Sequence, residues 1–318
     1  MVIPNFNGEA TIGKCLQSVY ASSYRDFEVI VVDDCSEDRS AEVIEKFPCK
    51  LVRLPSRSGA SRARNTGAAM SRGDAVFFTD SDCVLRPDTL AVAARAFERN
   101  PDLLIGGTYA PLSHDRRFLS DFQSVFVNYS ETKNPNPDYI ATHAMLISRR
   151  AFAESGGFAE DFLPILEDVE FSHRLRKRKV GLAMEPGLVV EHVFDYSLGR
   201  SLRNAFRKSL YWTIYSLWNK DLMRDSGTAS VELKADVLSW AASVGLLALY
   251  ALSGTRAALA GVAALWGLNL FINRGFIRAL KSAGGVPFAV AALLYYTALY
   301  PAAVGAGGLV GALRTIWR

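Results

Sequence analysis

The sequence predicts an α/β fold, with a mostly parallel sheet in the first 195 residues and apolar helices after it. Short apolar runs rich in β-branched residues alternate with segments of helical periodicity. The connections between these segments are short, which is typical of a doubly wound parallel sheet. Beyond Asp236, the last acidic residue, charged side chains become rare. This change in composition separates an α/β region from a helical, apolar one.

The predicted elements follow one another in a regular alternation. Apolar residues at Ile12, Leu16, Val19 and Tyr20 recur with helical spacing. In chain order we expect a strand that runs into a polar turn (2–8), a helix (11–20), a strand (27–32), a helix (36–47), a strand (51–54), a helix that begins after residues 58–61 and ends at Gly73, and a strand (76–79).

Two carboxylates follow the strand at residues 76–79. Asp80 and Asp82 are one residue apart, so in an extended chain their side chains point the same way. They lie at the carboxyl end of a buried strand, where open α/β sheets bind ligands. Paired carboxylates suit a hard divalent cation that bridges a diphosphate. An isolated Asp-x-Asp is more often a polar exit from a strand, so the surrounding motifs decide between these interpretations.

Those motifs resemble the family 2 glycosyltransferases in order and spacing over about residues 1–195. The segments that carry the resemblance are Pro4-Asn5-Phe6-Asn7-Gly8-Glu9, Val32-Asp33-Asp34-Cys35-Ser36, Ala63-Arg64-Asn65-Thr66-Gly67, Asp80-Ser81-Asp82, Ser155-Gly156-Gly157-Phe158, Glu167-Asp168-Val169-Glu170 and Arg174-Leu175-Arg176. The resemblance implies a GT-A fold, in which a Rossmann-like, nucleotide-binding sheet is joined to an acceptor-binding half. It also implies transfer of a sugar from a nucleotide donor with inversion at the anomeric carbon.

The resemblance also implies a role for each matching residue on the donor side. Binding of the nucleotide sugar would fall to Pro4, Asn7, Glu9, Asp33, Asp34, Arg62, Arg64, Asn65, Asp80 and Ser81. Asn7 and Asp34 have an alternative role in turn formation, because both residue types bond to nearby backbone. Arg62 could equally lie on a solvated helical face. A Mg²⁺ or Mn²⁺ ion would be held by Asp82 directly, with Asp80 and His192 as further metal-site residues.

The second half of the α/β region would supply the base that an inverting displacement needs. By resemblance this base is Asp168, with Glu167 orienting or binding the acceptor. Both acids start a predicted helix, where negative charge is also favourable for the helix itself. His143 falls near the expected acceptor side, where simple packing is its other interpretation. The Gln-x-x-Arg-Trp motif of processive synthases is absent from the sequence, which disfavours repeated addition to a growing chain.

The C-terminal third has the composition of a membrane region. Residues 237–253, 257–273 and 282–313 are uncharged apolar runs, so we expect a transmembrane region of about three helices at residues 236–318. Arg274, Arg278 and Lys281 would mark a cytoplasmic loop. The catalytic domain (1–195) would therefore lie on the cytoplasmic side of a multi-pass protein of the cytoplasmic membrane.

Residues 196–235 join the two regions and mix basic with aromatic side chains, among them Trp212 and Trp218. This mixture predicts a helical segment at the membrane surface, with the two tryptophans as interfacial anchors. Nucleic acid would also attract basic and aromatic residues, but the adjacent apolar runs favour the membrane, and we expect no nucleic-acid partner. The four cysteines are scattered without metal spacing. The sequence leaves the oligomeric state open.

The function predicted from these features is transfer of a sugar from a nucleotide-sugar donor to a lipid-linked or glycolipid acceptor. Two alternatives remain. A nucleotidyltransferase would share the sheet, but it should carry a Gly-rich phosphate loop after the first strand, where this chain has Pro4-Asn5-Phe6-Asn7. A subunit that only binds sugar nucleotides or scaffolds a synthesis complex should have degraded catalytic positions, whereas Asp80, Asp82 and Asp168 are present.

Overall fold

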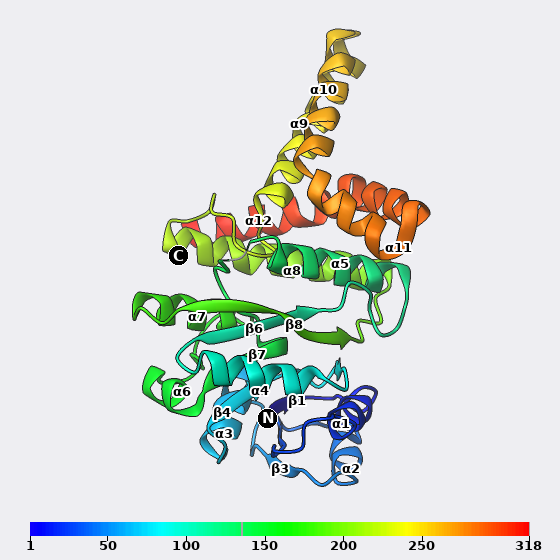
Figure 1. Cartoon of the computed structure of the whole chain (residues 1–318). Helices are drawn as coiled ribbons and strands as arrows, with labels where there is room; N and C mark the ends of the chain where they lie inside the picture. Colours follow the sequence, from blue (N-terminus) through cyan, green and yellow to red (C-terminus); the bar gives the residue numbers. More distant parts are fainter. Residues whose placement is uncertain (135, 318) are drawn as a thin grey trace. The chain divides into compact units, whose positions relative to one another are not determined.

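The computed structural model describes residues 1–134 and 136–317 (Figure 1). The chain forms two compact units. The first unit comprises Met1–Arg116 and Glu131–Asp195, and the second comprises Arg117–Ser130 and Tyr196–Arg318.

The first unit is built on a mixed sheet that has eight strands within the described residues. The strand order across the sheet is β3-β2-β1-β4-β7-β6-β8-β5. The strands are β1 (Val2–Asn5), β2 (Ile30–Asp33), β3 (Lys50–Arg53), β4 (Ala75–Phe78), β5 (Cys83–Leu85), β6 (Leu104–Tyr109), β7 (Met145–Ser148) and β8 (Leu182–His192). Strands β1 to β4 are parallel, as is β6 with β8, whereas β7 is antiparallel to both β4 and β6, and β5 is antiparallel to β8. The parallel half therefore carries the α/β alternation read from the sequence.

Helices connect the strands of this sheet. They are α1 (Ile12–Tyr20), α2 (Ser40–Ile44), α3 (Ala60–Ala69), α4 (Thr89–Arg99), α6 (Arg149–Ser155) and α7 (Glu167–Lys177), with a short 3₁₀ turn at Thr142–Ala144. The apolar positions of α1 that have helical spacing, Ile12, Leu16 and Val19, are fully buried. A larger core joins Phe78 of β4 to Phe152, Phe158 and Phe171, which come from α6, α7 and the turn between them. This aromatic core fixes α7, the helix that carries the predicted base, to the sheet.

Three predicted elements are shorter than expected. The helix predicted to end at Gly73 ends at Ala69, and the predicted strand at 27–32 begins only at Ile30. The predicted helix at 36–47 is reduced to α2, and the reason for its late start lies in polar residues. Asp33 accepts a hydrogen bond from the backbone N–H of Ser36, and Asp38 accepts from those of Glu9 and Ser40. Asp side chains that bond locally to backbone N–H groups compete with helix formation.

Pro4 determines where the sheet opens. In the parallel half, β1 pairs with β2 along its whole length but with β4 only at Val2 and Phe78. Proline has no N–H to donate to a ladder, so pairing with β4 stops before Pro4. The two central strands therefore separate at their carboxyl ends. Asp80 and Asp82 follow β4 at this opening, which is the position where open α/β sheets bind ligands.

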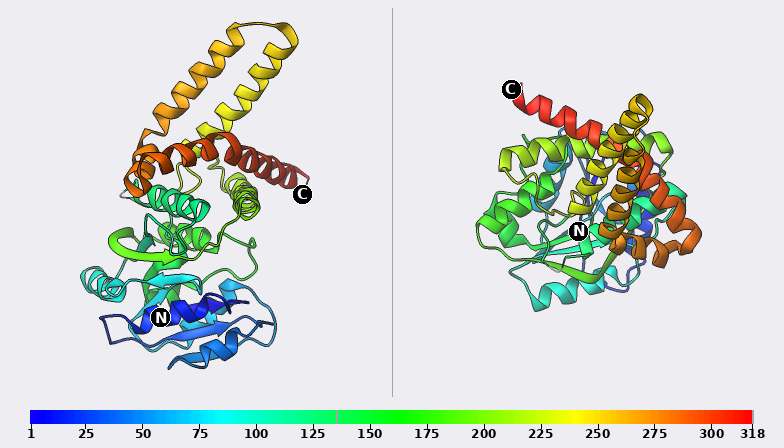
Figure 2. Two further views of the ribbon diagram at one scale, coloured as in Figure 1. Left: turned by 90° about the vertical axis from the view of Figure 1, so that its right-hand side faces the viewer. Right: turned by 90° about the horizontal axis from the view of Figure 1, so that it is seen from above.

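The second unit is helical. It contains α8 (Leu198–Asn219), α9 (Val231–Ser253), α10 (Ala257–Ile272), α11 (Arg274–Leu294), a π-helical turn (Tyr295–Leu299), α12 (Tyr300–Ile316) and most of α5 (Phe118–Thr132). Helices α9 and α10 form a long hairpin (Figure 2). Helices α8 and α12 approach closely at Gly307 and Gly311. A Cβ at these positions would lie 2.3 Å from the carbonyl oxygen of Phe206 and 2.5 Å from that of Leu210.

Within the described residues, two helical stretches are long and apolar enough to cross a membrane by length and composition, Val231–Ser253 and Arg274–Ile316. The predicted run at 257–273 forms the shorter apolar helix α10. The run at 282–313 is not one uniform helix, because Gly285 has a non-helical backbone and a π-helical turn precedes α12. The sequence located the apolar helices and left open whether the last run is one tilted helix or is broken near Pro301 and residues 305–308. The structure is irregular at Gly285 and at the π-helical turn instead, and α12 continues through Pro301.

Arg274, Arg278 and Lys281 do not form a loop. They lie exposed on the first turns of α11, while Phe276 and Leu280 between them are buried. The start of α11 is thus an amphipathic basic helix, a type of element that lies along membrane surfaces. Trp212 also differs from its prediction, because its side chain is only 8% exposed, whereas that of Trp218 is 48% exposed. Only Trp218 has the exposure that an interfacial anchor needs.

Candidate active site

Asp33 is the last residue of β2 and Asp34 follows it, and both are buried in hydrogen-bond networks. Asp33 accepts from Asn5 Nδ2 at 2.8 Å and from Ser36 Oγ at 2.5 Å, which ties β2 to β1. Asp34 accepts from the backbone N–H groups of Ser58 and Gly59, at 2.6 and 2.8 Å, immediately before α3. The two aspartates therefore shape the carboxyl edge of the sheet and hold the entry to the helix that carries Arg62, Arg64 and Asn65.

Asn7 and Glu9 belong to the turn after β1. Asn7 has a left-handed backbone (φ 49°), and its Oδ1 accepts from the N–H of Glu37 at 2.9 Å. Glu9 forms an exposed ion pair with Arg39 at 2.5 Å. The turn chemistry considered for Asn7 is thus present. It brings the loops after β1 and β2 together at the same edge as the Asp80-Ser81-Asp82 motif, since a Cβ on Gly8 would lie 3.4 Å from Ser81 Oγ.

Arg64 connects the two carboxylate motifs. Its guanidinium is buried and donates to Asp80 Oδ1 at 2.6 Å and to Glu167 Oε1 at 2.7 Å. Burial alone would lower the pKa of Arg64, but the neighbouring carboxylates of Asp80, Glu167 and Asp168 raise it above its ordinary value. One cation therefore joins the end of β4 to the start of α7. The donor-side and base-side motifs consequently meet in one site.

Asp80 and Asp82 have opposite electrostatic environments. Burial would raise the pKa of Asp80, but Arg64, His143 and His192 together lower it, which favours the ionised form. Burial raises the pKa of Asp82, and the Asp80 carboxylate adds to this effect while His192 opposes it. The side chain of Asp82 is 40% exposed, yet its Oδ1 atom is enclosed and has no hydrogen-bond partner within the described residues. A nearby cation would therefore stabilise the ionised form of Asp82, which burial and Asp80 disfavour.

His192 and Cys83 complete this part of the site. They face each other in the pairing of β8 with β5, and His192 Nε2 lies 3.4 Å from Asp82 Oδ1. Carboxylate oxygens of Asp80 and Asp82 and the sulfur of Cys83 lie within 4.8 Å of one another. Burial raises the pKa of the Cys83 thiol well above its usual value. Two carboxylates and an imidazole are a donor set that fits Mg²⁺ or Mn²⁺.

Asn65 and Arg62 secure the second half of the unit to α3. Asn65 accepts from the N–H of Phe158 at 2.9 Å and donates to its carbonyl oxygen at 2.8 Å. Gly157 makes this contact possible, since it has φ +70° and a Cβ there would lie 2.5 Å from Asn65 Oδ1. Arg62 forms an ion pair with Glu160 at 2.7 Å. Asn65 therefore positions the Ser155-Gly156-Gly157-Phe158 turn.

Glu167 and Asp168 occupy the first turn of α7, as the sequence predicted. Leu166, the residue before the helix, is buried with a left-handed backbone (φ 76°), a conformation that is uncommon for a non-glycine residue. Asp168 Oδ1 accepts from the N–H of Val169 at 2.8 Å. Glu167 Oε1 accepts from Arg64 at 2.7 Å, and the Asp168 carboxylate also raises the pKa of that guanidinium. Both acids at the start of α7 therefore lie in the field of the same cation.

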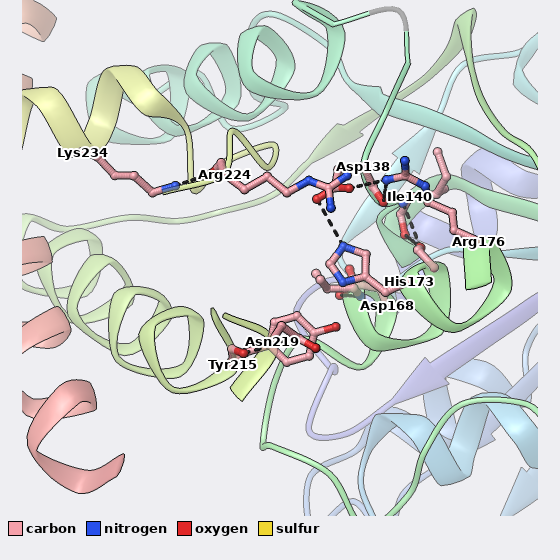
Figure 3. A network of polar contacts seen from close by, with 11 residues as sticks. Asp138, Ile140, Asp168, His173, Arg176, Tyr215, Asn219, Arg224 and Lys234 are labelled. Carbon is pink, nitrogen blue, oxygen red and sulfur yellow. Dashed lines mark hydrogen bonds and ion pairs between the residues drawn. The ribbon is translucent and has the colours of Figure 1, made fainter. Parts of the chain in front are cut away.

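Two polar clusters were not predicted from the sequence. Asp138 accepts from His173 Nε2 at 3.2 Å and also pairs with Arg176, both on α7 (Figure 3). His143 stacks on Tyr109 with ring centroids 3.9 Å apart, and its Nε2 lies 3.4 Å from Glu131. Asp138 follows a polar Asn-Pro-Asn-Pro stretch that gave no indication of a partner. His143 is confirmed as buried, with a side-chain carboxylate beside it.

Comparison with known proteins agrees with this geometry. The family model described as Glycosyl transferase family 2 matches residues 1–156. Residues 1–156 form a family 2 glycosyltransferase domain. An uncharacterized glycosyltransferase of Haemophilus influenzae is 34% identical over 104 residues, which are 32% of this chain and 35% of that protein. The poly(ribitol-phosphate) β-N-acetylglucosaminyltransferase TarS of Staphylococcus aureus is 34% identical over 113 residues, 33% of this chain and 20% of that protein.

The glycosyltransferase domain has the GT-A fold. A mannosyltransferase from Pyrobaculum calidifontis, solved in complex with GDP-Man and Mn²⁺, superimposes with a TM-score of 0.60 over 99% of this chain and 86% of that one, at 17% identity. At this identity the likeness concerns the fold. The chain spans about a third or less of the lengths of the two relatives above.

Arg64 offers a test of how this site is held together. We expect Arg64→Met to lower the free energy of unfolding by about 3 kcal/mol, because it leaves Asp80 and Glu167 close together without their shared cation. Arg150→Met is the matched control. It removes an exposed ion pair with Glu154 on α6, and such pairs contribute little. Urea unfolding of both variants in detergent measures the difference, and equal stabilities would contradict a structural role for Arg64.

Proposed function

We propose that this chain is an inverting glycosyltransferase that transfers a sugar from a nucleotide-sugar donor to a lipid-linked acceptor. The observation that carries the proposal is the Arg64 bridge, which links Asp80 after β4 to Glu167 at the start of α7. It brings the carboxylates suited to a diphosphate-bound cation together with the carboxylates suited to proton transfer. A nucleotide-binding scaffold alone would not need the second pair.

The proposed reaction uses these residues in distinct roles. Asp82 and His192 would hold a Mg²⁺ or Mn²⁺ ion, and Asp80, fixed by Arg64, would contact the ribose or a water beside that ion. The cation, when bound, neutralises the departing diphosphate. Asp168 takes the proton of the acceptor hydroxyl. At the same time the hydroxyl oxygen bonds to the anomeric carbon, and the bond from that carbon to the diphosphate breaks. Asp33 and Asp34 line the nucleoside pocket with Pro4, Asn7 and Glu9.

The second unit supports a membrane location for this activity. The basic face of α11 (Arg274, Arg278 and Lys281) and the exposed arginines of α8 (Arg200, Arg203 and Arg207) suit an anionic membrane surface. The α9–α10 hairpin has basic residues at its base and only Arg256 near its tip. By the positive-inside tendency, we place the base of the hairpin on the cytoplasmic side. We accordingly propose a multi-pass protein of the cytoplasmic membrane with a cytoplasmic catalytic domain.

The proposal is tested by screening nucleotide sugars against the full-length protein in a neutral detergent. We expect one nucleotide sugar to raise the melting temperature and to be hydrolysed slowly, in both cases only with Mg²⁺ or Mn²⁺ present. A ligand at about 100 times its Kd adds about 2.7 kcal/mol of stability, which such a measurement resolves. Nucleoside monophosphates are the control, because they lack the diphosphate. Failure of every nucleotide sugar to bind or be hydrolysed would overturn the proposal.

A further inference from the structure

A largely apolar cavity of ≈ 400 Å³ lies within the second unit, between α8, α9, α12 and the segment that joins α8 to α9. Its volume falls in the range of small-molecule binding sites, about 300–1,000 Å³. The walls include Trp212, Val237 and Leu309, while Leu222 and Met223 at its edge are 41% and 71% exposed. An apolar cavity edged by exposed apolar side chains suits a hydrocarbon chain.

The charge in this cavity has one sign. Among the described residues that line it, Lys208 and Lys234 carry the only charged side chains, and no carboxylate is present. Lys234 donates to the carbonyl oxygen of Arg224, which holds its ammonium beside the joining segment (Figure 3). Two ammonium groups next to an apolar cavity favour a ligand with an anionic head and an apolar body.

The glycines of α12 indicate that this space is built into the helix packing. Gly307 and Gly311 face the backbone of α8 and allow no side chain, as described above. Gly305 and Gly308 instead line the cavity, where a Cβ would meet its nearest neighbours only at 3.4 Å, from Val237 and Thr213 respectively. One pair of glycines thus brings the helices together, and the other leaves room between them.

We propose that this cavity binds the hydrocarbon chain of an acceptor saccharide linked to a polyprenyl phosphate, with the linking phosphate at Lys208 and Lys234 and a hydroxyl of the saccharide as the group that attacks. At roughly 30 Å³ for each small group, the cavity holds about a dozen carbon atoms. A dozen carbon atoms are part of one hydrocarbon chain and far fewer than the two chains of a membrane phospholipid contain. A polyprenyl phosphate carries a single chain. The proposal rests on the proposed function, because it names the acceptor class of that reaction.

The test measures binding of farnesyl phosphate, a single-chained isoprenoid phosphate, to the full-length protein in a neutral detergent. We expect farnesyl phosphate to raise the melting temperature, and phosphatidylglycerol at equal concentration not to compete with it. Gly308→Leu fills the cavity and should weaken binding at least about tenfold, the loss expected when roughly one methylene pair can no longer be buried. Lys208→Gln, which keeps the cavity open, should weaken the binding of farnesyl phosphate but not that of the uncharged farnesol.

Gly267→Leu is the matched control, because a Cβ at Gly267 of α10 meets nothing within 4 Å and this glycine does not line the cavity. Its binding should equal that of the unmodified protein. All three variants should retain nucleotide-sugar hydrolysis. Unchanged binding in both Gly308→Leu and Lys208→Gln, or equal competition by phosphatidylglycerol, would overturn the assignment while leaving the proposed function intact. If the unmodified protein binds farnesyl phosphate but hydrolyses no nucleotide sugar, that result would instead count against the proposed function.

Discussion

Asp82→Asn should reduce sugar transfer at least about 100-fold. Lewis-acid stabilisation by a bound cation contributes several kcal/mol, and each 1.36 kcal/mol is a factor of ten in rate. The enclosed Oδ1 of Asp82, 3.4 Å from His192 Nε2, is the oxygen that a cation would bind. An asparagine can present one neutral oxygen but no charge. The measurements are kcat/KM for transfer and the dependence of donor-induced thermal stabilisation on Mg²⁺ or Mn²⁺.

Asp74→Asn is the matched control for this substitution. Asp74 is exposed and directly precedes β4, so the two aspartates flank the same strand at opposite ends. Of these two aspartates, only Asp82 lies in the candidate site, so Asp74→Asn should leave activity unchanged. Full activity of the unmodified protein in the presence of a chelator would contradict the metal assignment, as would an unaffected Asp82→Asn enzyme.

Local patterns were sufficient to predict the elements that form the carboxyl edge of the sheet. Asp33 and Asp34 come at the end of one apolar run, and Asp80 and Asp82 follow another. In the structure Asp33 ends β2, Asp34 follows it, and the other two lie between β4 and β5. The length of α2 was not predictable from periodicity. It depends on Asp33 and Asp38 bonding to backbone N–H groups, a competition that apolar spacing does not record.

Contacts between distant segments set the limit of sequence reasoning on the site. Arg64 was predicted to lie near the diphosphate because of its motif. Its bond to Glu167, 103 positions away, depends on how the aromatic core places α7 on the sheet. The burial of Trp212 also depends on a contact between segments that are distant in the sequence. Its basic and aromatic neighbours predict a surface helix, but the close approach of α12 at Gly307 and Gly311 decides which face of α8 is covered.

Asp168→Asn should keep donor and metal affinity but lose roughly 10²–10⁴-fold in turnover, the usual contribution of a general base. The amide oxygen of asparagine can still accept the hydrogen bond from Val169 N–H at 2.8 Å, so the first turn of α7 should be preserved. It cannot accept the proton of an acceptor hydroxyl. Arg64 would remain paired with Asp80 and Glu167, which keeps the donor side of the site in place.

The diagnostic measurement separates kcat from the Kd of the donor. Asp161→Asn provides the control, since Asp161 is an exposed acid in the loop that precedes α7 and should affect neither quantity. If Asp168→Asn weakened nucleotide binding as much as turnover, Asp168 would be a donor ligand or a structural residue. In that case the base would have to be sought elsewhere, and Glu167 would be a poor substitute because its Oε1 already accepts from the Arg64 guanidinium at 2.7 Å.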